Sequence, residues 1–196
     1  MNQYSMKNTI RAAAIGLGLL SLAQFAYAAP IMYSVNQTFG PGSAVGTITT
    51  DGTIGTLASA DIIAWSLTLN DGTNTVLVQT GANNSYAAIT GGALTATSTD
   101  LIFNYSFGTN SDFSIATPNA PPPVWGQICY TNFSNCWGPA GVGVYNVGGD
   151  GQLVYISQTG LHTIASGGTA VVPAPASLAL LALGLLGLGI SRRRNA

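Results

Sequence analysis

The stretch IAWSLTLNDGTNTVLVQT, residues 63–80, decides the fold class of this chain. In its first half, apolar residues occupy every second position, namely Ile63, Trp65, Leu67 and Leu69. A period of two places these side chains on one face of a β-strand. The Asn-Asp-Gly sequence at 70–72 is a turn signal, and a second β-prone run follows at 75–80. The stretch therefore predicts a β-hairpin.

The same kind of pattern extends outward in both directions. We expect strands at residues 31–39, 45–50, 53–57, 63–69, 75–80, 93–99, 101–107, 124–130, 142–147, 153–157 and 162–165. Asp-Gly turns at 51–52 and 150–151 join further pairs, and Ser59 could cap one helical turn. Residues 108–123 are rich in turn formers, and residues 167–170 are expected to be a linker. Short strands separated by turns predict an all-β fold, which we expect to be an antiparallel β-sandwich with jelly-roll-like connectivity.

The beginning of the chain has the features of a secretory signal peptide. Lys7 and Arg11 precede an uncharged run at 12–23, and small residues, Ala26 and Ala28, stand where signal peptidase reads its substrate. We expect residues 1–28 to be removed by cleavage after Ala28. An uncleaved anchor helix is the alternative, and the short apolar run disfavours it.

The end of the chain predicts a membrane segment. Residues 174–190, which include the apolar run at 176–190, carry no charge, and as a helix they would span roughly 25 Å, enough to cross a locally thinned bilayer. Three arginines follow it, Arg192, Arg193 and Arg194, and should act as a stop-transfer signal on the cytoplasmic side. A buried core helix is disfavoured because the run is apolar on all sides.

A short motif, a marginal span and a basic terminus occur here in that order. The motif is Val172, Pro173, Ala174 and Pro175. This arrangement, over residues 172–196, resembles the PEP-CTERM sorting signal of exported bacterial proteins. The resemblance implies an exosortase-like partner, a membrane-embedded cysteine transpeptidase that cuts at the motif. The family usually has Val-Pro-Glu-Pro, and Ala174 stands here in place of the glutamate.

The two terminal segments leave residues 29–172 as one exported domain of ordinary size. All five Lys and Arg lie in the terminal segments, so this domain has only its six Asp and a net charge of about −6. A nucleic-acid partner is excluded, because no cation can displace counterions from phosphate. We expect the domain to be held outside the cytoplasm by the C-terminal helix and, after processing, to reach the cell surface or the extracellular medium.

The only two cysteines, Cys129 and Cys136, lie in the exported part and should form a local disulfide. Four aromatic residues surround it, namely Trp125, Tyr130, Phe133 and Trp137. If exposed, such rings could stack on sugar faces, with Asn132 and Asn135 as hydrogen-bonding partners. The alternative, which we favour, is that two or more of the rings fill the core.

The inventory of reactive residues argues against an enzyme. His162 is the sole histidine and is interpreted as an ordinary strand or surface residue, and no Gly-x-Ser-x-Gly motif is present. One His and two Cys leave a zinc site incomplete. Most of the Asp residues are turn formers, a role that we also prefer over calcium binding at 70–74 and 110–112. We therefore expect neither metal nor cofactor.

Two functions remain compatible with these observations. The first is a non-enzymatic cell-surface or extracellular-matrix protein. The alternative is a carbohydrate-binding module displayed by the same anchor, with extracellular polysaccharide as its partner. Exposure of the aromatic rings near the disulfide would distinguish them.

Overall fold

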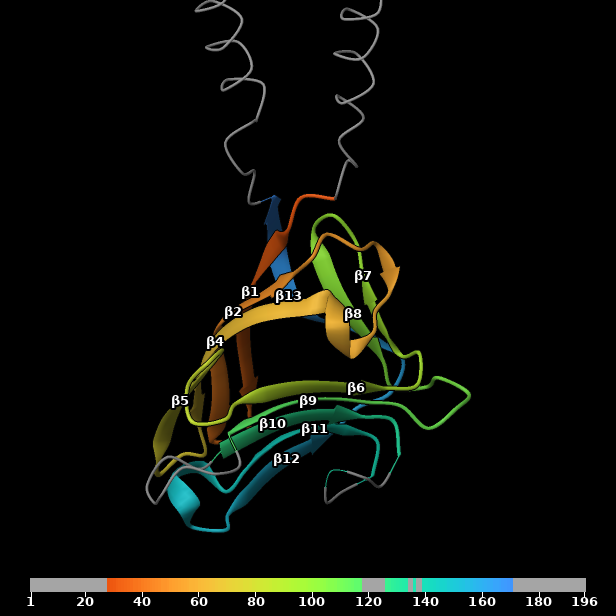
Figure 1. Cartoon of the computed structure of the whole chain (residues 1–196). Helices are drawn as coiled ribbons and strands as arrows, with labels where there is room; N and C mark the ends of the chain where they lie inside the picture. Colours follow the sequence, from red (N-terminus) through yellow and green to blue (C-terminus); the bar gives the residue numbers. More distant parts are fainter. Residues whose placement is uncertain (1–27, 118–125, 134–135, 137–138, 171–196) are drawn as a thin grey trace, which may run out of the picture.

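The computed structural model describes residues 28–117, 126–133, 136 and 139–170. In this part of the chain, every strand pairing is antiparallel, and the strands form two sheets of eight and five. The helical elements described here are two single 3-10 turns, η1 (Ser59–Asp61) and η2 (Val147–Gly149). The predicted all-β antiparallel sandwich is confirmed, as is the single helical turn after Ala58 (Figure 1).

The larger sheet has the strand order β3-β7-β8-β13-β1-β2-β4-β5. Its strands are β1 (Ile31–Phe39), β2 (Gly42–Thr50), β3 (Gly55–Thr56), β4 (Ile62–Asn70), β5 (Thr75–Gln79), β7 (Leu94–Ala96), β8 (Asp100–Asn104) and β13 (Leu161–Ala170). The smaller sheet has the order β12-β11-β10-β9-β6. Its strands are β6 (Tyr86–Thr90), β9 (Asp112–Thr117), β10 (Gly126–Thr131), β11 (Gly141–Tyr145) and β12 (Leu153–Ser157).

Six of the twelve connections join strands that are neighbours in one sheet. The chain crosses between the sheets four times, from β5 to β6, β6 to β7, β8 to β9 and β12 to β13. Within the smaller sheet β9 to β12 form a continuous meander, and in the larger one β1, β2, β4 and β5 are successive neighbours. The sandwich therefore combines meanders with crossings between the two sheets.

The core lies between the sheets. Its largest fully buried side chains come from both of them, for example Leu67 and Phe103 from the larger sheet and Phe113 and Tyr130 from the smaller one. The Phe113 and Tyr130 rings stack with their centroids 5.7 Å apart, and Phe103 approaches Tyr130 at 6.2 Å. Burying such rings contributes about 2 to 3 kcal/mol each to folding, so this aromatic contact helps to hold the sheets together.

The alternation at 63–69 is confirmed except at its first residue. Leu67 and Leu69 are buried and Trp65 packs against the core, but Ile63 is 44% exposed while Ile62 is buried. The pairing of β2 with β4 shifts register at this point, from Thr49↔Ala64 to Thr50↔Ile62. One extra residue in a strand reverses which side chains face the core, so the bulge explains the error.

All three Asp-Gly dipeptides form the same local turn. In each, the aspartate Oδ1 accepts a hydrogen bond from the backbone N–H two residues on, at 2.8 to 2.9 Å, and the glycine has a positive φ. Only two of the turns join paired strands, β4 to β5 and β11 to β12. The expected hairpin at Asp51 is wrong, because β2 pairs with β1 and β4 while β3 pairs with β7.

Several strands of the structure differ from those predicted from the sequence. Strands β6 and β9 were not predicted; β9 (DFSIAT) is buried along almost its whole length and so lacks alternation. Phe107 was placed on the strand that begins near residue 101, yet β8 ends at Asn104 and Phe107 is exposed. Residues 167–170 were expected to be a linker and instead form the last part of β13.

The two ends of the described domain lie side by side. Ile31 of β1 is the partner of Ala170 of β13, and Met32 is the partner of Thr169. Figure 1 shows the beginning of β1 and the end of β13 at the same end of the sandwich. The segments that precede residue 28 and follow residue 170 are therefore attached at one common end of the domain.

The residues predicted to direct export and membrane anchoring lie mostly outside the described residues. This applies to Ala26 of the cleavage site, to the motif at 172–175, to the apolar run at 176–190 and to the three arginines. Ala28 is described and is exposed. Within the described ranges, no helix has the length and the hydropathy that crossing a membrane requires.

Candidate functional site

Strands β1 and β13 are paired at one end and separate toward the other. Their pairing runs from Ile31↔Ala170 to Ser34↔Ser166 and goes no further, although β1 continues to Phe39. Over the same length β13 stays paired with β8, with a register shift between Thr163 and Ala165. A bulge of this kind turns a strand away from its neighbour. The larger sheet is therefore split between β1 and β13.

Gln37 bridges this split. It occupies an inward position of β1, in register with the buried Tyr33, Val35 and Phe39, where an apolar residue is the ordinary choice. Its Nε2 donates to the backbone carbonyl oxygens of Thr163 and Ile164, both at 3.1 Å. Because these carbonyls lie at the bulge, Gln37 supplies the hydrogen bonds that a paired β-strand would otherwise provide.

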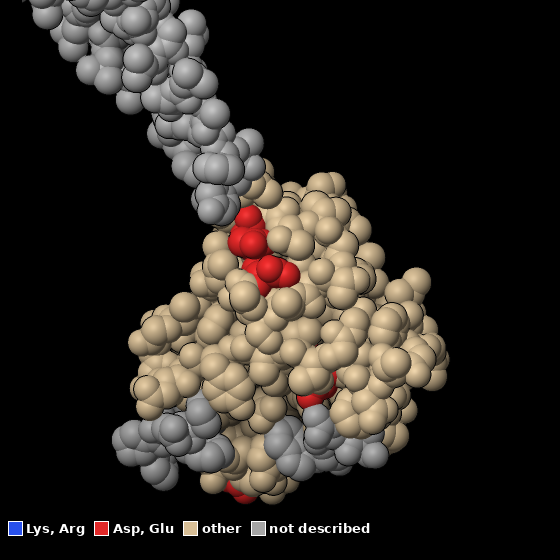
Figure 2. All heavy atoms as spheres, turned by 45° about the vertical axis from the view of Figure 1, so that its right-hand side comes forward, with Lys and Arg blue, Asp and Glu red and all other residues tan. Residues whose placement is uncertain are grey.

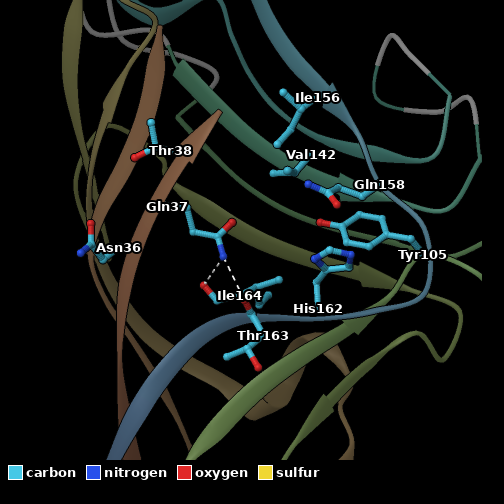
Figure 3. A pocket seen from close by; sticks show the side chains of 10 residues that line it. All are labelled: Asn36, Gln37, Thr38, Tyr105, Val142, Ile156, Gln158, His162, Thr163 and Ile164. Atoms are coloured by element: carbon cyan, nitrogen blue, oxygen red, sulfur yellow. Dashed lines mark hydrogen bonds between the residues drawn. The ribbon is translucent and has the colours of Figure 1, made fainter. Parts of the chain in front are cut away.

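A pocket of about 260 Å³ lies at the split. Strand β1 lines one side of it and β13 the other, and strands of the smaller sheet close it from behind (Figure 3). The lining residues are Asn36, Gln37, Thr38, Tyr105, Val142, Ile156, Gln158, His162, Thr163 and Ile164. The pocket thus has an apolar floor of Val and Ile with amides, hydroxyls and one imidazole around it.

Tyr105 and His162 form an aromatic pair at this pocket. Their rings meet edge to face with centroids 5.4 Å apart. The His162 Nε2 lies 3.0 Å from the Thr159 carbonyl oxygen, which can only accept, so this nitrogen donates and the other nitrogen of a neutral ring is left as an acceptor. The prediction that His162 is an ordinary strand residue holds for its place on β13 but overlooked its place in the pocket.

Tyr105 is buried, and its hydroxyl lines the pocket. The residue is only 4% exposed, and its oxygen makes no hydrogen bond to another described residue. In Figure 3 this oxygen points toward the space between Gln37 and Gln158. Burial raises the pKa of Tyr105, helped by the neighbouring Tyr130 and Tyr155. A hydroxyl that lines a pocket can form its hydrogen bonds with water or with a ligand.

The electrostatics of the pocket are neutral. None of its lining residues is an Asp, Lys or Arg. Three aspartates lie instead near the end of the domain that carries the chain termini. There the Asp51 N–H donates to the Asp61 carbonyl at 2.9 Å, and Asp100 is paired with Ser166 of β13. Figure 2 shows acidic side chains gathered close to this end and no basic ones on the described surface in view. Figure 2 also shows acidic side chains away from this end, but no aspartate is among the residues that line the pocket.

The disulfide between Cys129 and Cys136 is present, as predicted. The aromatic residues around it do not form an exposed platform in the part that is described. Tyr130 is 1% exposed and stacks on Phe113 in the core, so it cannot contact a ligand from solution, and Phe133 is half-buried. Burial without a hydrogen bond raises the pKa of Tyr130. Trp125 and Trp137 lie outside the described residues.

Asn132, proposed as a sugar-binding amide, instead holds two loops together. Its Nδ2 donates to the carbonyl oxygens of Phe107 and Thr109, and its Oδ1 accepts from the Ser111 N–H at 2.7 Å. Its own N–H donates to the Ser111 carbonyl at 3.2 Å. Both polar groups of its side chain are therefore used within the protein. Asn135 lies outside the described residues.

The two loops considered for calcium are organised by turn chemistry. At 70–74, the Asp71 Oδ1 accepts from the N–H groups of Thr73 and Asn74, and Asn74 donates to Asp150. Burial raises the pKa of Asp71, but the hydrogen bonds from Asn74 and Thr73 outweigh it, so the pKa lies below the usual value. The loop at 110–112 is held by Asn132 through the Ser111 N–H.

Sequence reasoning could not find the pocket. Its residues come from β1, β11, β12 and β13 and from the segments after β8 and β12. The one signal available was Gln37, a polar residue in the apolar series of β1. A polar residue at an inward strand position indicates either a buried hydrogen bond or a cavity, and here the structure has both.

Comparison with known proteins identifies one part of the chain. Residues 171–194 match the PEP-CTERM protein-sorting motif, the segment that the sequence analysis singled out. No curated protein and no solved structure matches the chain. The motif implies export and membrane-anchored sorting, with exosortase as the processing partner. Through this C-terminal segment the chain is similar to the exported proteins that exosortase sorts.

Proposed function

We propose that this protein is a non-enzymatic module displayed at the cell surface or in the extracellular matrix. In this proposal, signal peptidase removes residues 1–28, and a helix at 176–190 anchors the module until exosortase cuts at Val172–Pro175. The match at residues 171–194 is the observation that carries the proposal.

The geometry of the domain supports display from one end. Residue 31 and residue 170 are direct β-sheet partners, so removal of the leader leaves the module attached through its C-terminal strand. The hairpin turn of β1 and β2 at Gly40 and Pro41 lies at the far end of the same strands. Surfaces near that turn would then face away from the membrane.

The chemistry of the domain supports a role without catalysis. The pocket contains one imidazole and no carboxylate, so it offers no acid and base pair. The described aspartates at 51, 71 and 150 serve as turn formers through their Oδ1 atoms. We therefore propose that the protein is not an enzyme.

The test is the intact mass and the location of the protein in producing cells, with and without the sorting enzyme. We expect a mature start at Ala29 in both, and a shortened C-terminus only when the enzyme is present. The double variant Pro173→Ala/Pro175→Ala should keep the full tail. The matched control Pro121→Ala/Pro123→Ala should be processed normally. An unchanged tail mass in cells with the enzyme would contradict the sorting proposal.

A further inference from the structure

We propose that the pocket at the β1–β13 split binds one residue of a neutral saccharide. The inference rests on the volume, the charge and the unused hydrogen-bonding groups of the pocket. It is independent of the sorting proposal, because it concerns the folded domain whether or not the tail is processed.

The size of the pocket suits one small ring. Its volume of about 260 Å³ corresponds to roughly eight water molecules. Sites for drug-sized ligands begin at about 300 Å³, so a larger compound would not fit entirely inside. A single pyranose can enter, while further sugar units would extend into solvent.

The charge of the pocket selects against ionic ligands. With no Lys or Arg in its lining, a phosphate or a carboxylate would lose its hydration without gaining a cation. With no Asp there, an ammonium group would also lack a partner. A neutral ligand pays neither cost.

The free polar groups match hydroxyls. The Tyr105 hydroxyl and the Gln158 amide group line the pocket and make no hydrogen bond to a described residue, and one nitrogen of His162 is free. The Gln37 carbonyl oxygen also points toward the space, since only its Nε2 is used (Figure 3). These groups include both donors and acceptors, and a sugar hydroxyl can serve either.

The apolar floor matches the other side of a sugar. Val142, Ile156 and Ile164 can contact the C–H groups of a pyranose while its hydroxyls reach the polar groups. A planar base would need an open aromatic face to stack on, and the ring of Tyr105 is instead packed edge to face against His162 and tilted against Phe103 at 4.9 Å. The lining therefore favours a saccharide over a nucleobase.

The test uses His162 as a reporter. It is the only histidine in the chain, so in a protein without a polyhistidine tag its ring resonances are assigned without ambiguity. The full chain, held in a detergent without a sugar headgroup, is titrated with glucose, galactose, mannose and N-acetylglucosamine. We expect at least one of them to shift the His162 resonances saturably, with a Kd in the millimolar range.

Matched variants locate the site. Tyr105→Phe removes only the hydroxyl and should weaken binding about fivefold to tenfold, whereas Tyr130→Phe removes a buried unpartnered hydroxyl outside the pocket lining and should not. Gln158→Ala should also weaken binding, while Gln152→Ala, at an exposed residue outside the lining, should leave it unchanged.

Three outcomes would overturn the proposal. The first is that none of the four sugars shifts His162 up to about 50 mM, well above the expected range. The second is that a sugar binds equally well to Tyr105→Phe and to Gln158→Ala, which would place binding elsewhere. The third is that inorganic phosphate or glucuronate shifts His162 at lower concentrations than any neutral sugar.

Discussion

The two halves of strand β1 have the same neighbour on one side and different surroundings on the other. From Ile31 to Ser34 the strand pairs with β13, and the hydroxyl of the buried Tyr33 donates to the Thr97 carbonyl at 2.7 Å. From Val35 onward β13 has moved away, and the hydroxyl of Tyr105, which lines the pocket there, makes no hydrogen bond to a described residue. The comparison teaches that one pair of strands both closes the core and opens a polar pocket.

The largest expected difference between the halves is in packing. Tyr33→Ala should lower the free energy of unfolding by about 3 to 5 kcal/mol, because it empties a fully buried site and removes a hydrogen bond. His162→Ala, in the open half, should cost less than about 1 kcal/mol. Chemical denaturation measures both, and equal losses would show that the two halves are packed alike.

The bridge across the split gives the next largest effect. Gln37→Leu should cost about 1 to 3 kcal/mol, because it leaves the carbonyls of Thr163 and Ile164 without this donor. The neighbouring Asn36→Ala removes an exposed side chain with no hydrogen bond to a described residue, and should stay within about 0.5 kcal/mol. A Gln37→Leu variant as stable as the control would mean that the bulge does not need the bridge.

High pH should destabilise the protein through its buried tyrosines. Burial raises the pKa of Tyr105 and of Tyr130, so the folded state keeps their protons while the unfolded chain releases them above about pH 10. Stability is thus unaffected below pH 10 and lost as pH rises beyond it, by about 1.4 kcal/mol per tyrosine at pH 11.

Denaturation curves between pH 8 and pH 11 measure this loss, and Tyr105→Phe should make it smaller. The tyrosinate absorbance of Tyr105 and Tyr130 should appear together with unfolding. Complete titration of every tyrosine in a protein that stays folded would contradict the burial of these two hydroxyls.

The smallest effect compares the two hydroxyls directly. Tyr33→Phe should cost about 1 kcal/mol, because the Thr97 carbonyl loses its donor. Tyr105→Phe should stay within about 0.5 kcal/mol without ligand, because the hydroxyl lines the pocket and makes no hydrogen bond to a described residue. Thermal unfolding of the pair gives the sign of each change. A Tyr105→Phe loss equal to that of Tyr33→Phe would indicate a hidden partner for the Tyr105 hydroxyl.

Local chemistry was predictable from the sequence, and pairing across long distances was not. The Asn-Asp-Gly turn at 70–72 and the strand at 31–39 are where the pattern places them, because one residue series fixes each. The Asp51 turn also forms, yet the strands on either side of it do not pair with each other. Strand β3 pairs with β7 instead, where Gly55 is the partner of Ala96. The bulge at Ile63 is invisible to a strict period of two.

The site was even less accessible from the sequence. The sequence places Tyr105 within an alternating apolar run, although β8 ends at Asn104, and it places His162 on a strand, which is correct. What makes them functional candidates is the failure of β13 to follow β1 beyond Ser34, which depends on a bulge at Thr163. The sequence between residues 34 and 163 carries no pattern that indicates this separation of β1 and β13.

Amide hydrogen exchange along β1 tests the split most directly. Phe39 and Gly42 flank a two-residue hairpin loop, so alternation places the N–H groups of Val35 and Gln37 toward β2 and those of Ser34 and Asn36 toward β13. We predict slow exchange at Ser34, Val35 and Gln37, and exchange at least about tenfold faster at Asn36. Uniform protection from residue 31 to residue 39 would contradict the account, because it would mean that β1 and β13 stay paired and no pocket opens between them.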